Sequence, residues 1–171
     1  NDMVSIMLDP YGTGVWAYQF YVNPYGIQRD LLWNSLGRAD IGFDCIWEAA
    51  AHRTATGYTV EVAIPFASIR FPNQESQSWR MDFQRARPRD AYLQYSWAAN
   101  DRSEQCVPCQ WGTVTGINNV QPGRGIGVLP AMVSHQNGAI VERSNPKSSF
   151  HNEDPSAELS LGAKYSITSD I

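Results

Sequence analysis

Residues 57–66 read GYTVEVAIPF and lie between DCIWE at residues 44–48 and WRMDFQR at residues 79–85. In the central segment, large apolar side chains alternate with polar or small ones, which is typical of a strand with one buried face. A turn connects it to a preceding strand, expected at residues 46–52, and a third strand is expected at residues 79–87. The stretch therefore predicts three short strands in succession.

The sequence indicates where the second of these strands ends and where the third begins. Pro65 has no N–H to donate to a sheet, so the second strand should stop there. Residues 66–71 have room for one helical turn, and the polar residues 73–78 separate it from the third strand.

Further strands are predicted on both sides of this stretch. The segments DPYGTG at residues 9–14 and NPYG at residues 23–26 are dense in turn-forming residues. The strand between them is apolar on both faces, which favours a position in the middle of a sandwich. The additional strands are expected at residues 3–8, 15–22, 27–33, 92–97 and 110–117.

Several of these segments together resemble a known family. They are the tryptophan-containing strand, VEVAIPF at residues 60–66, IRF at 69–71 and the Trp-x-x-x-Phe-x-Arg pattern at 79–85. This order is similar to the family 9 carbohydrate-binding module found at the N-terminus of large bacterial outer-membrane proteins with an uncharacterised C-terminal barrel. The similarity covers roughly Met3 to Ile117. We therefore predict an all-β fold, an antiparallel β-sandwich of the jelly-roll kind.

The resemblance also implies strands that this sequence does not contain. In the family, several strands, including a tryptophan-bearing segment, precede the ones seen here. We therefore expect an N-terminally incomplete module, with open edges that pair with another chain or copy. The N-terminus also lacks the basic-then-apolar pattern of a signal peptide, so we expect a mature or excised form.

The pattern changes after the module. Residues 1–117 are assigned to the sandwich, the Pro- and Gly-containing residues 118–125 to a linker and residues 126–171 to a separate β-element. Residues 157–167 alternate regularly between apolar and polar or small side chains. Such a dyad repeat is typical of transmembrane barrel strands and of any half-exposed strand. With the resemblance, the start of a C-terminal barrel is the favoured interpretation.

Composition narrows the classes of partner. The net charge is −4 and the chain has only two lysines, Lys147 and Lys164. A nucleic-acid backbone is therefore not an expected partner. No run approaches the ~18 apolar residues of a membrane-spanning helix.

The three cysteines cannot all pair within one chain. Cys106 and Cys109 have the spacing of a redox motif, but they lie in a polar loop. We predict a local disulfide between them, which would fit an oxidising compartment. Free thiols and a metal or redox site are the alternatives. A zinc site would need a second pair of ligands, and the three histidines are scattered singly.

No catalytic constellation is found in the sequence. Glu48 and Glu61 lie on neighbouring predicted strands, as in a glycosidase pair, but an ion pair of Glu61 with Arg53 or Arg85 is the favoured role. A phosphate loop and a nucleophile elbow are missing. We predict that the chain is not an enzyme and binds no metal or cofactor. The aspartates at the loop edges lack the spacing of a calcium-binding loop, so calcium is only weakly indicated. The methionines and histidines offer no convincing pair of axial ligands for haem.

Saccharides are bound by stacking on exposed aromatic rings while polar side chains bond the hydroxyl groups. The candidate site is the loop edge that contains Trp97, Asn100, Asp101 and Arg102, with Tyr11 as an opposing wall. The alternative is that these residues only cover the end of the sandwich. Four tryptophans within strand patterns are expected in the core: Trp16, Trp47, Trp79 and Trp111.

The predicted function is a noncatalytic carbohydrate-binding module with a glycan as ligand. By the resemblance, it would lie in the periplasm of a Gram-negative bacterium and reach the outer membrane through a C-terminal barrel absent from this chain. The alternative is a structural or interaction β-sandwich that docks on its own barrel or on a partner. An exposed aromatic pair with free polar neighbours would favour the first; an apolar surface along an open edge strand would favour the second.

Overall fold

A computed structural model describes residues 2–34, 38–122, 126–145 and 147–165. These residues divide into two compact units, one up to residue 122 and one from residue 126 on. Both consist of antiparallel β-strands and turns, so the predicted all-β class is confirmed. Residues 123–125 of the expected linker and residues 166–171 of the expected C-terminal element lie outside the described residues.

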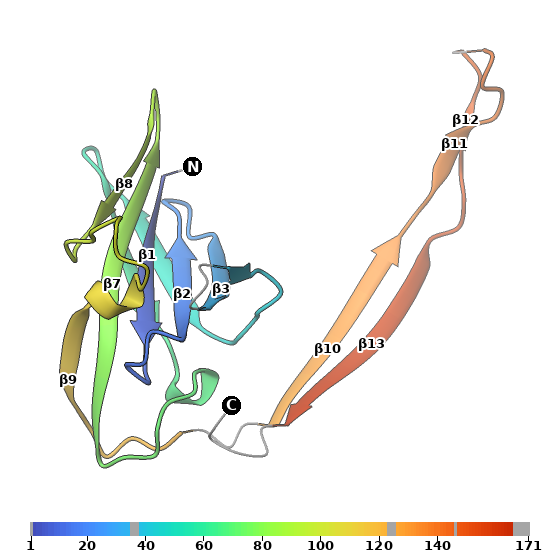
Figure 1. Cartoon of the computed structure of the whole chain (residues 1–171). Helices are drawn as coiled ribbons and strands as arrows, with labels where there is room; N and C mark the ends of the chain where they lie inside the picture. The colour runs from blue at the N-terminus through green and yellow to red at the C-terminus, as the bar shows by residue number, and fades with distance from the viewer. Residues whose placement is uncertain (1, 35–37, 123–125, 146, 166–171) are drawn as a thin grey trace. The chain divides into compact units, whose positions relative to one another are not determined.

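The first unit is built on a seven-stranded antiparallel sheet (Figure 1). Six strands follow one another across it in the order β4 (Ala39–Asp40), β3 (Gln28–Asn34), β2 (Trp16–Val22), β1 (Met3–Asp9), β7 (Ser76–Pro88) and β8 (Tyr92–Ser96). The seventh, β9 (Gly112–Asn118), also pairs with β7. Each strand predicted for this sheet is present, with ends shifted by a few residues.

The long strand β7 is the centre of the sheet. Its residues 80–86 pair with β1 on one side. On its other side, residues 84–88 pair with β8 and residues 76–81 pair with β9. The chain between β8 and β9 therefore leaves the sheet edge near the middle of β7.

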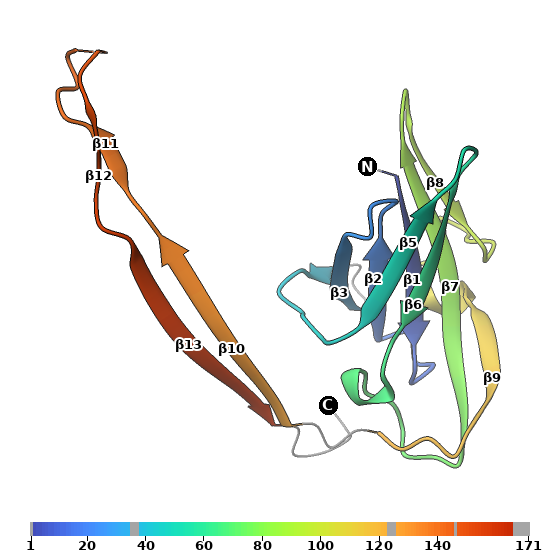
Figure 2. The same cartoon turned by 180° about the vertical axis from the view of Figure 1, so that it is seen from behind.

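A hairpin of β5 (Glu48–Arg53) and β6 (Tyr58–Ala63) covers one face of this sheet (Figure 2). The main core lies between the two layers and is rich in aromatic side chains, with Phe20 against Trp47 and Phe71 against Trp79. The segment after Pro65 forms the expected single turn, a 3₁₀ helix at Phe66–Ser68, before Phe71 enters the core. The predicted antiparallel sandwich is confirmed, with layers of unequal size.

The opposite face of the sheet carries a smaller apolar cluster, in which Met7 and Ala17 pack with Trp111. Three of the four tryptophans expected in the core are buried: Trp47, Trp79 and Trp111. Trp16 is the exception, because its side chain is 37 % exposed. It is the first residue of β2, and its side chain belongs to neither apolar cluster, so the prediction that it lies in the core was wrong.

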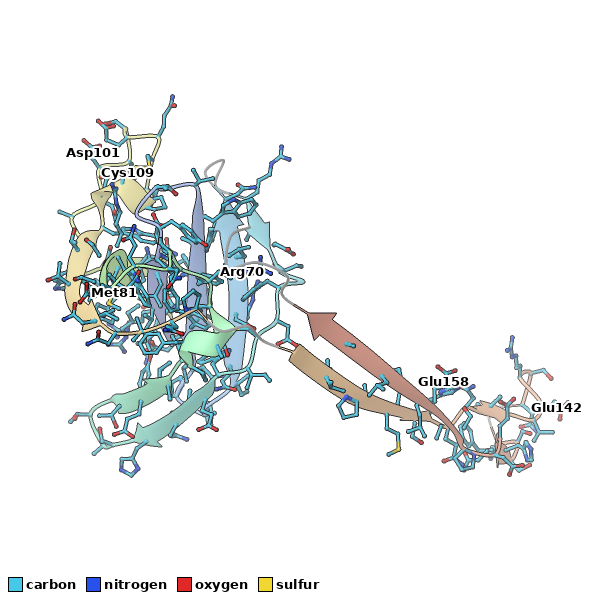
Figure 3. The ribbon with its side chains drawn as sticks, turned by 90° about the horizontal axis from the view of Figure 1, so that it is seen from below. Arg70, Met81, Asp101, Cys109, Glu142 and Glu158 are labelled. Atoms are coloured by element: carbon cyan, nitrogen blue, oxygen red, sulfur yellow. A yellow bond between two sulfur atoms is a disulfide. The ribbon has the colours of Figure 1, made fainter. Side chains whose placement is uncertain are left out.

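The second unit is a two-stranded ribbon of β10 (Ile126–His135) and β13 (Ser156–Tyr165), extended by β11 (Gly138–Ile140) and β12 (Phe150–Asn152). Residues directly opposite each other share a face. Over residues 128–132 and 159–163, one face of β10–β13 therefore carries only apolar side chains: Val128, Pro130, Met132, Leu159, Leu161 and Ala163. The other face includes Glu158, His135 and Ser160; Figure 3 labels Glu158 on this ribbon. Among the described residues, no helix has the length and apolar character needed to span a lipid bilayer.

Candidate functional site

A pocket of about 250 Å³, here called the amide pocket, opens on the sheet face opposite the β5–β6 hairpin. Its walls contain five side-chain amides, those of Gln19, Asn34, Gln84, Gln94 and Gln105. Three aromatic side chains, Tyr21, Trp33 and Trp111, complete its polar part, and Met7, Val107 and Pro108 are its aliphatic residues. Among the residues that the structure describes, no acidic or basic side chain lines it.

Strand pairing explains which side chains from neighbouring strands line the pocket. Gln84 of β7 and Tyr21 of β2 both lie opposite Ser5 of β1, so these three residues form one row across the sheet. Ser5 itself is buried under the amide of Gln19, whereas Gln84 and Tyr21 on its two sides line the pocket. Gln94 of β8 lies opposite Ala86, in the neighbouring row on the same face, and extends the pocket towards the sheet edge.

The amides of the pocket differ in whether they already have partners. The Gln19 amide already has partners, since its Nε2 donates to Ser5 Oγ at 3.0 Å and its Oε1 accepts a hydrogen bond from Trp33 Nε1. Within the described part of the chain, the amides of Gln84, Gln94 and Gln105 make no hydrogen bond, and they remain available to a ligand.

Trp111 is only 6 % exposed, and its buried Nε1 has no hydrogen-bond partner among the described residues. A buried donor left without an acceptor costs about 1–3 kcal/mol. Trp111, which lines the pocket, thus carries a buried donor that the described residues do not satisfy.

Tyr21 supplies a neutral hydroxyl to the pocket. Burial raises the pKa of Tyr21 to about 12, although the positive charge of Arg29 opposes this shift. The Arg29 guanidinium carbon lies 6.0 Å from the centre of the Tyr21 ring. The phenol therefore keeps its proton at neutral pH and can both donate and accept a hydrogen bond.

The loop between β8 and β9 forms one wall of the pocket through Gln105, Val107 and Pro108. A disulfide closes this loop locally: Cys106 and Cys109 are bonded, with their Cα atoms 5.3 Å apart, as predicted. Cys45 is in no disulfide. Figure 3 labels Cys109 and Asp101, which both belong to this loop.

The disulfide rests on the turn after β1. A Cβ atom added to Gly14 would lie 2.6 Å from Cys106 Sγ and 2.8 Å from Cys109 Sγ, so the bond packs directly on the glycine. The turn is held by the buried carboxylate of Asp9, which accepts hydrogen bonds from the backbone N–H groups of Tyr11, Gly12 and Gly14.

The residues expected to bind a ligand are not gathered in one cavity. Asn100 Nδ2 donates to Ser96 Oγ at 2.7 Å. Asp101 accepts hydrogen bonds from the backbone and side chain of Ser103, which lower its pKa. Arg102 is exposed, and Tyr11 lies in the turn after β1. None of these four lines the amide pocket or the groove beside Trp97.

Trp97 lines a second cavity, here called the aromatic groove, of about 450 Å³. Its side chain is 66 % exposed, packs over Gly112 and makes an edge contact with Phe83, the ring centres being 6.2 Å apart. Tyr95 lies on the same wall, and Val60 and Val62 of β6 also line the groove. The side of β6 that does not pair with β5 has no strand partner among the described residues.

Charged groups at the end of this groove pair with each other. Arg85 donates to both carboxylate oxygens of Asp2, at 3.1 and 2.8 Å, and Tyr58 Oη donates to the same carboxylate. The expected ion pair of Glu61 with Arg85 or Arg53 is absent from the described residues, because Arg85 binds Asp2 and Arg53 lies over the Tyr25 ring. The described residues also contain no cluster of three or more metal-binding side chains.

No protein-family model, curated protein or solved structure matches the chain. The residues of the amide pocket were not singled out from the sequence. One signal was present: Gln19, Gln84 and Gln94 lie on predicted strands, and each has at least one aromatic residue next to it in the sequence. Such amides on one sheet face are a feature that polar ligands exploit.

Proposed function

We propose that the first unit is a noncatalytic carbohydrate-binding module and that the amide pocket takes a neutral saccharide. The observation that carries this proposal is the composition of the pocket, which combines aromatic rings and uncommitted amides with no charged side chain. Sugar rings have apolar faces that stack on aromatic side chains, and hydroxyl rims that pair with amides. Ligands that carry a phosphate, carboxylate or ammonium group would enter this pocket without a counter-charge, which disfavours them.

The size of the pocket supports a single ring as the bound unit. At about 250 Å³ it is smaller than the ~300–1,000 Å³ typical of pockets for drug-sized ligands. A longer glycan would place one terminal or side-branch residue in the pocket and leave the rest in solvent.

The test is calorimetric titration of the full chain with a panel of neutral mono- and oligosaccharides. Replacing both Gln84 and Gln94 by alanine removes two uncommitted amides and should lower the affinity about tenfold or more. The matched control is Gln121→Ala, an exposed glutamine outside the pocket. A second control is Trp97→Ala, which removes a lining residue of the aromatic groove and none of the amide pocket.

Binding that survives in both controls and weakens in the double variant supports the amide pocket. If Trp97→Ala abolishes binding while the double variant retains it, the saccharide site lies in the aromatic groove instead. Absence of heat with every saccharide, from a chain whose circular dichroism shows it to be folded, would refute the carbohydrate-binding function.

The aromatic groove favours a second candidate function, an interaction domain. Phe83, Tyr95 and Trp97 are all exposed on one wall, and the free side of β6 borders the same groove. A strand that pairs with β6 would cover these rings while it satisfies the backbone groups of the edge. Addition of such a partner should protect the β6 amides from hydrogen exchange, and Trp97→Ala should weaken that protection.

We further propose that the module works in the periplasm and that the second unit contacts the outer membrane as the beginning of a barrel. The disulfide supports an oxidising compartment. β10 and β13 each have ten residues, which is within the ~9–11 residues of a transmembrane strand, and one face of the pair is apolar. Flotation with phosphatidylcholine vesicles tests this: Leu159→Ser with Leu161→Ser should abolish binding, whereas Ser160→Ala on the other face should preserve it.

A further inference from the structure

We infer that the sugar accepted by the amide pocket carries an acetamido group, as in the N-acetylhexosamines. This inference rests on the proposed function and specifies the ligand of the same pocket. Two features of the pocket carry it: the unsatisfied indole N–H of Trp111, and the aliphatic side chains that surround this residue.

The aliphatic residues lie together beside Trp111. Met7 packs with Trp111 in one apolar cluster. Pro108 and Val107 precede it in a tight turn, in which the backbone N–H of Trp111 donates to the Pro108 carbonyl at 3.3 Å and the backbone N–H of Gln110 donates to the Val107 carbonyl at 3.1 Å. One part of the pocket is therefore apolar, whereas Gln84 and Gln94 lie on the strands of its other part.

A plain hexose does not suit a pocket that has one apolar part and one polar part. Its hydroxyl groups surround the whole ring, and any hydroxyl placed against Met7, Val107 or Pro108 would lose its hydrogen bonds to water without replacement. An acetamido group instead ends in a methyl group, which such a surface accepts. Its carbonyl oxygen is a strong acceptor for the donor of Trp111, and its N–H suits the oxygen of a glutamine amide.

The pocket also separates acetylated from free amino sugars. Glucosamine carries an ammonium group near neutral pH, and the pocket has no carboxylate to pair with it. Burial of an unpaired charge is strongly unfavourable. The expected order of affinity is therefore N-acetylglucosamine first, glucose second and glucosamine last.

The experiment is titration of the full chain with these three sugars, combined with saturation-transfer NMR of N-acetylglucosamine. We expect N-acetylglucosamine to bind about tenfold more tightly than glucose, with the strongest saturation at its acetyl methyl protons. Trp111→Phe keeps an aromatic ring but removes the N–H, and it should reduce the preference for N-acetylglucosamine over glucose to about twofold.

Each result decides the inference. Equal affinity for glucose and N-acetylglucosamine would overturn it and leave the proposed function intact. A preference unchanged in Trp111→Phe, or weak saturation of the acetyl methyl, would also overturn it, because the acetamido group would then be recognised elsewhere. Failure of all three sugars and of the wider panel to bind would refute the proposed function itself. The comparison between sugars needs only the unaltered chain, so it stands even if Trp111→Phe does not fold.

Discussion

Gly14 lies directly against Cys106: a Cβ atom at position 14 would come within 2.6 Å of the Cys106 sulfur. The φ angle of Gly14 is +74°, a conformation that side chains other than glycine rarely adopt. One glycine thus supports both the turn after β1 and the disulfide loop that walls the amide pocket.

Gly14→Ala should destabilise the first unit through both effects. The left-handed conformation costs about 1–2 kcal/mol, and crowding against the sulfurs should add about 1–3 kcal/mol. The free energy of unfolding, measured in urea, would report the sum. Gly26→Ala is the matched control, because Gly26 has a similar φ of +79° but no atom within 4 Å of an added Cβ. Equal losses in the two variants would contradict the close packing at Gly14.

The Asp2–Arg85 pair should contribute modestly to stability, and only above acidic pH. Hydrogen bonds from Arg85 are the largest cause of the lowered pKa of Asp2, whose ordinary value is 3.8. The contribution is therefore complete above that value and is lost as the pH falls through the lower folded-state pKa. Because the side chains are 46 % and 17 % exposed, we expect only about 0.2–1 kcal/mol from Arg85→Met near neutral pH. The loss should become smaller as the pH falls below 3.8, and Arg102→Met should show none at neutral or acidic pH.

Among the described residues, three tyrosines have a raised pKa and should ionise late: Tyr18, Tyr21 and Tyr58. Burial raises the pKa of both Tyr21 and Tyr58 to about 12, and the carboxylate of Asp2 adds to the shift at Tyr58. Their neutral forms stabilise the folded state, so this stability is complete below the ordinary value of 10 and is lost as the pH rises through about 12. Ultraviolet titration of the phenols should lose one late step in Tyr21→Phe and another in Tyr58→Phe. Unchanged late steps in both variants would contradict the assignment.

Saccharide binding should be nearly independent of pH between about pH 5 and 9. The described lining of the amide pocket includes no acidic or basic side chain, and its ionisable phenol, Tyr21, has a pKa of about 12. Titrations at several pH values in this range should therefore give the same affinity within about twofold. A steep change near pH 6.5 would instead indicate a histidine in the site.

Local features of the fold could be predicted because they depend on neighbouring residues. Three such features are the alternation at residues 58–63, the end of the strand at Pro65 and the short turn after it. Each depends only on residues a few positions away in the sequence. The pairing of β7 with β1 could not be predicted in the same way. It joins residues about eighty positions apart, such as Met3 and Ala86, and nothing in either segment alone specifies the other.

The amide pocket was harder to predict than the disulfide. Cys106 and Cys109 are three residues apart, so their spacing alone indicates a local bond. The pocket brings together Gln84, Gln94 and Gln105 from two strands and a loop. Whether each can hydrogen-bond a ligand depends on which amides remain without a partner after folding. For example, the Gln19 amide is hydrogen-bonded to Ser5 and Trp33, and no sequence pattern predicts these two bonds.

The divided pairing of β7 has a consequence for how this protein can change. β8 and β9 each hold their own portion of β7, so the register of both strands is fixed without the segment that connects them. That connection can therefore be exchanged for longer or shorter versions while the sheet keeps its alignment. Gln105, Val107 and Pro108 lie within it, whereas Gln84 and Gln94 do not. Homologous proteins, or a designer, could thus vary ligand selectivity by loop replacement on an unchanged scaffold.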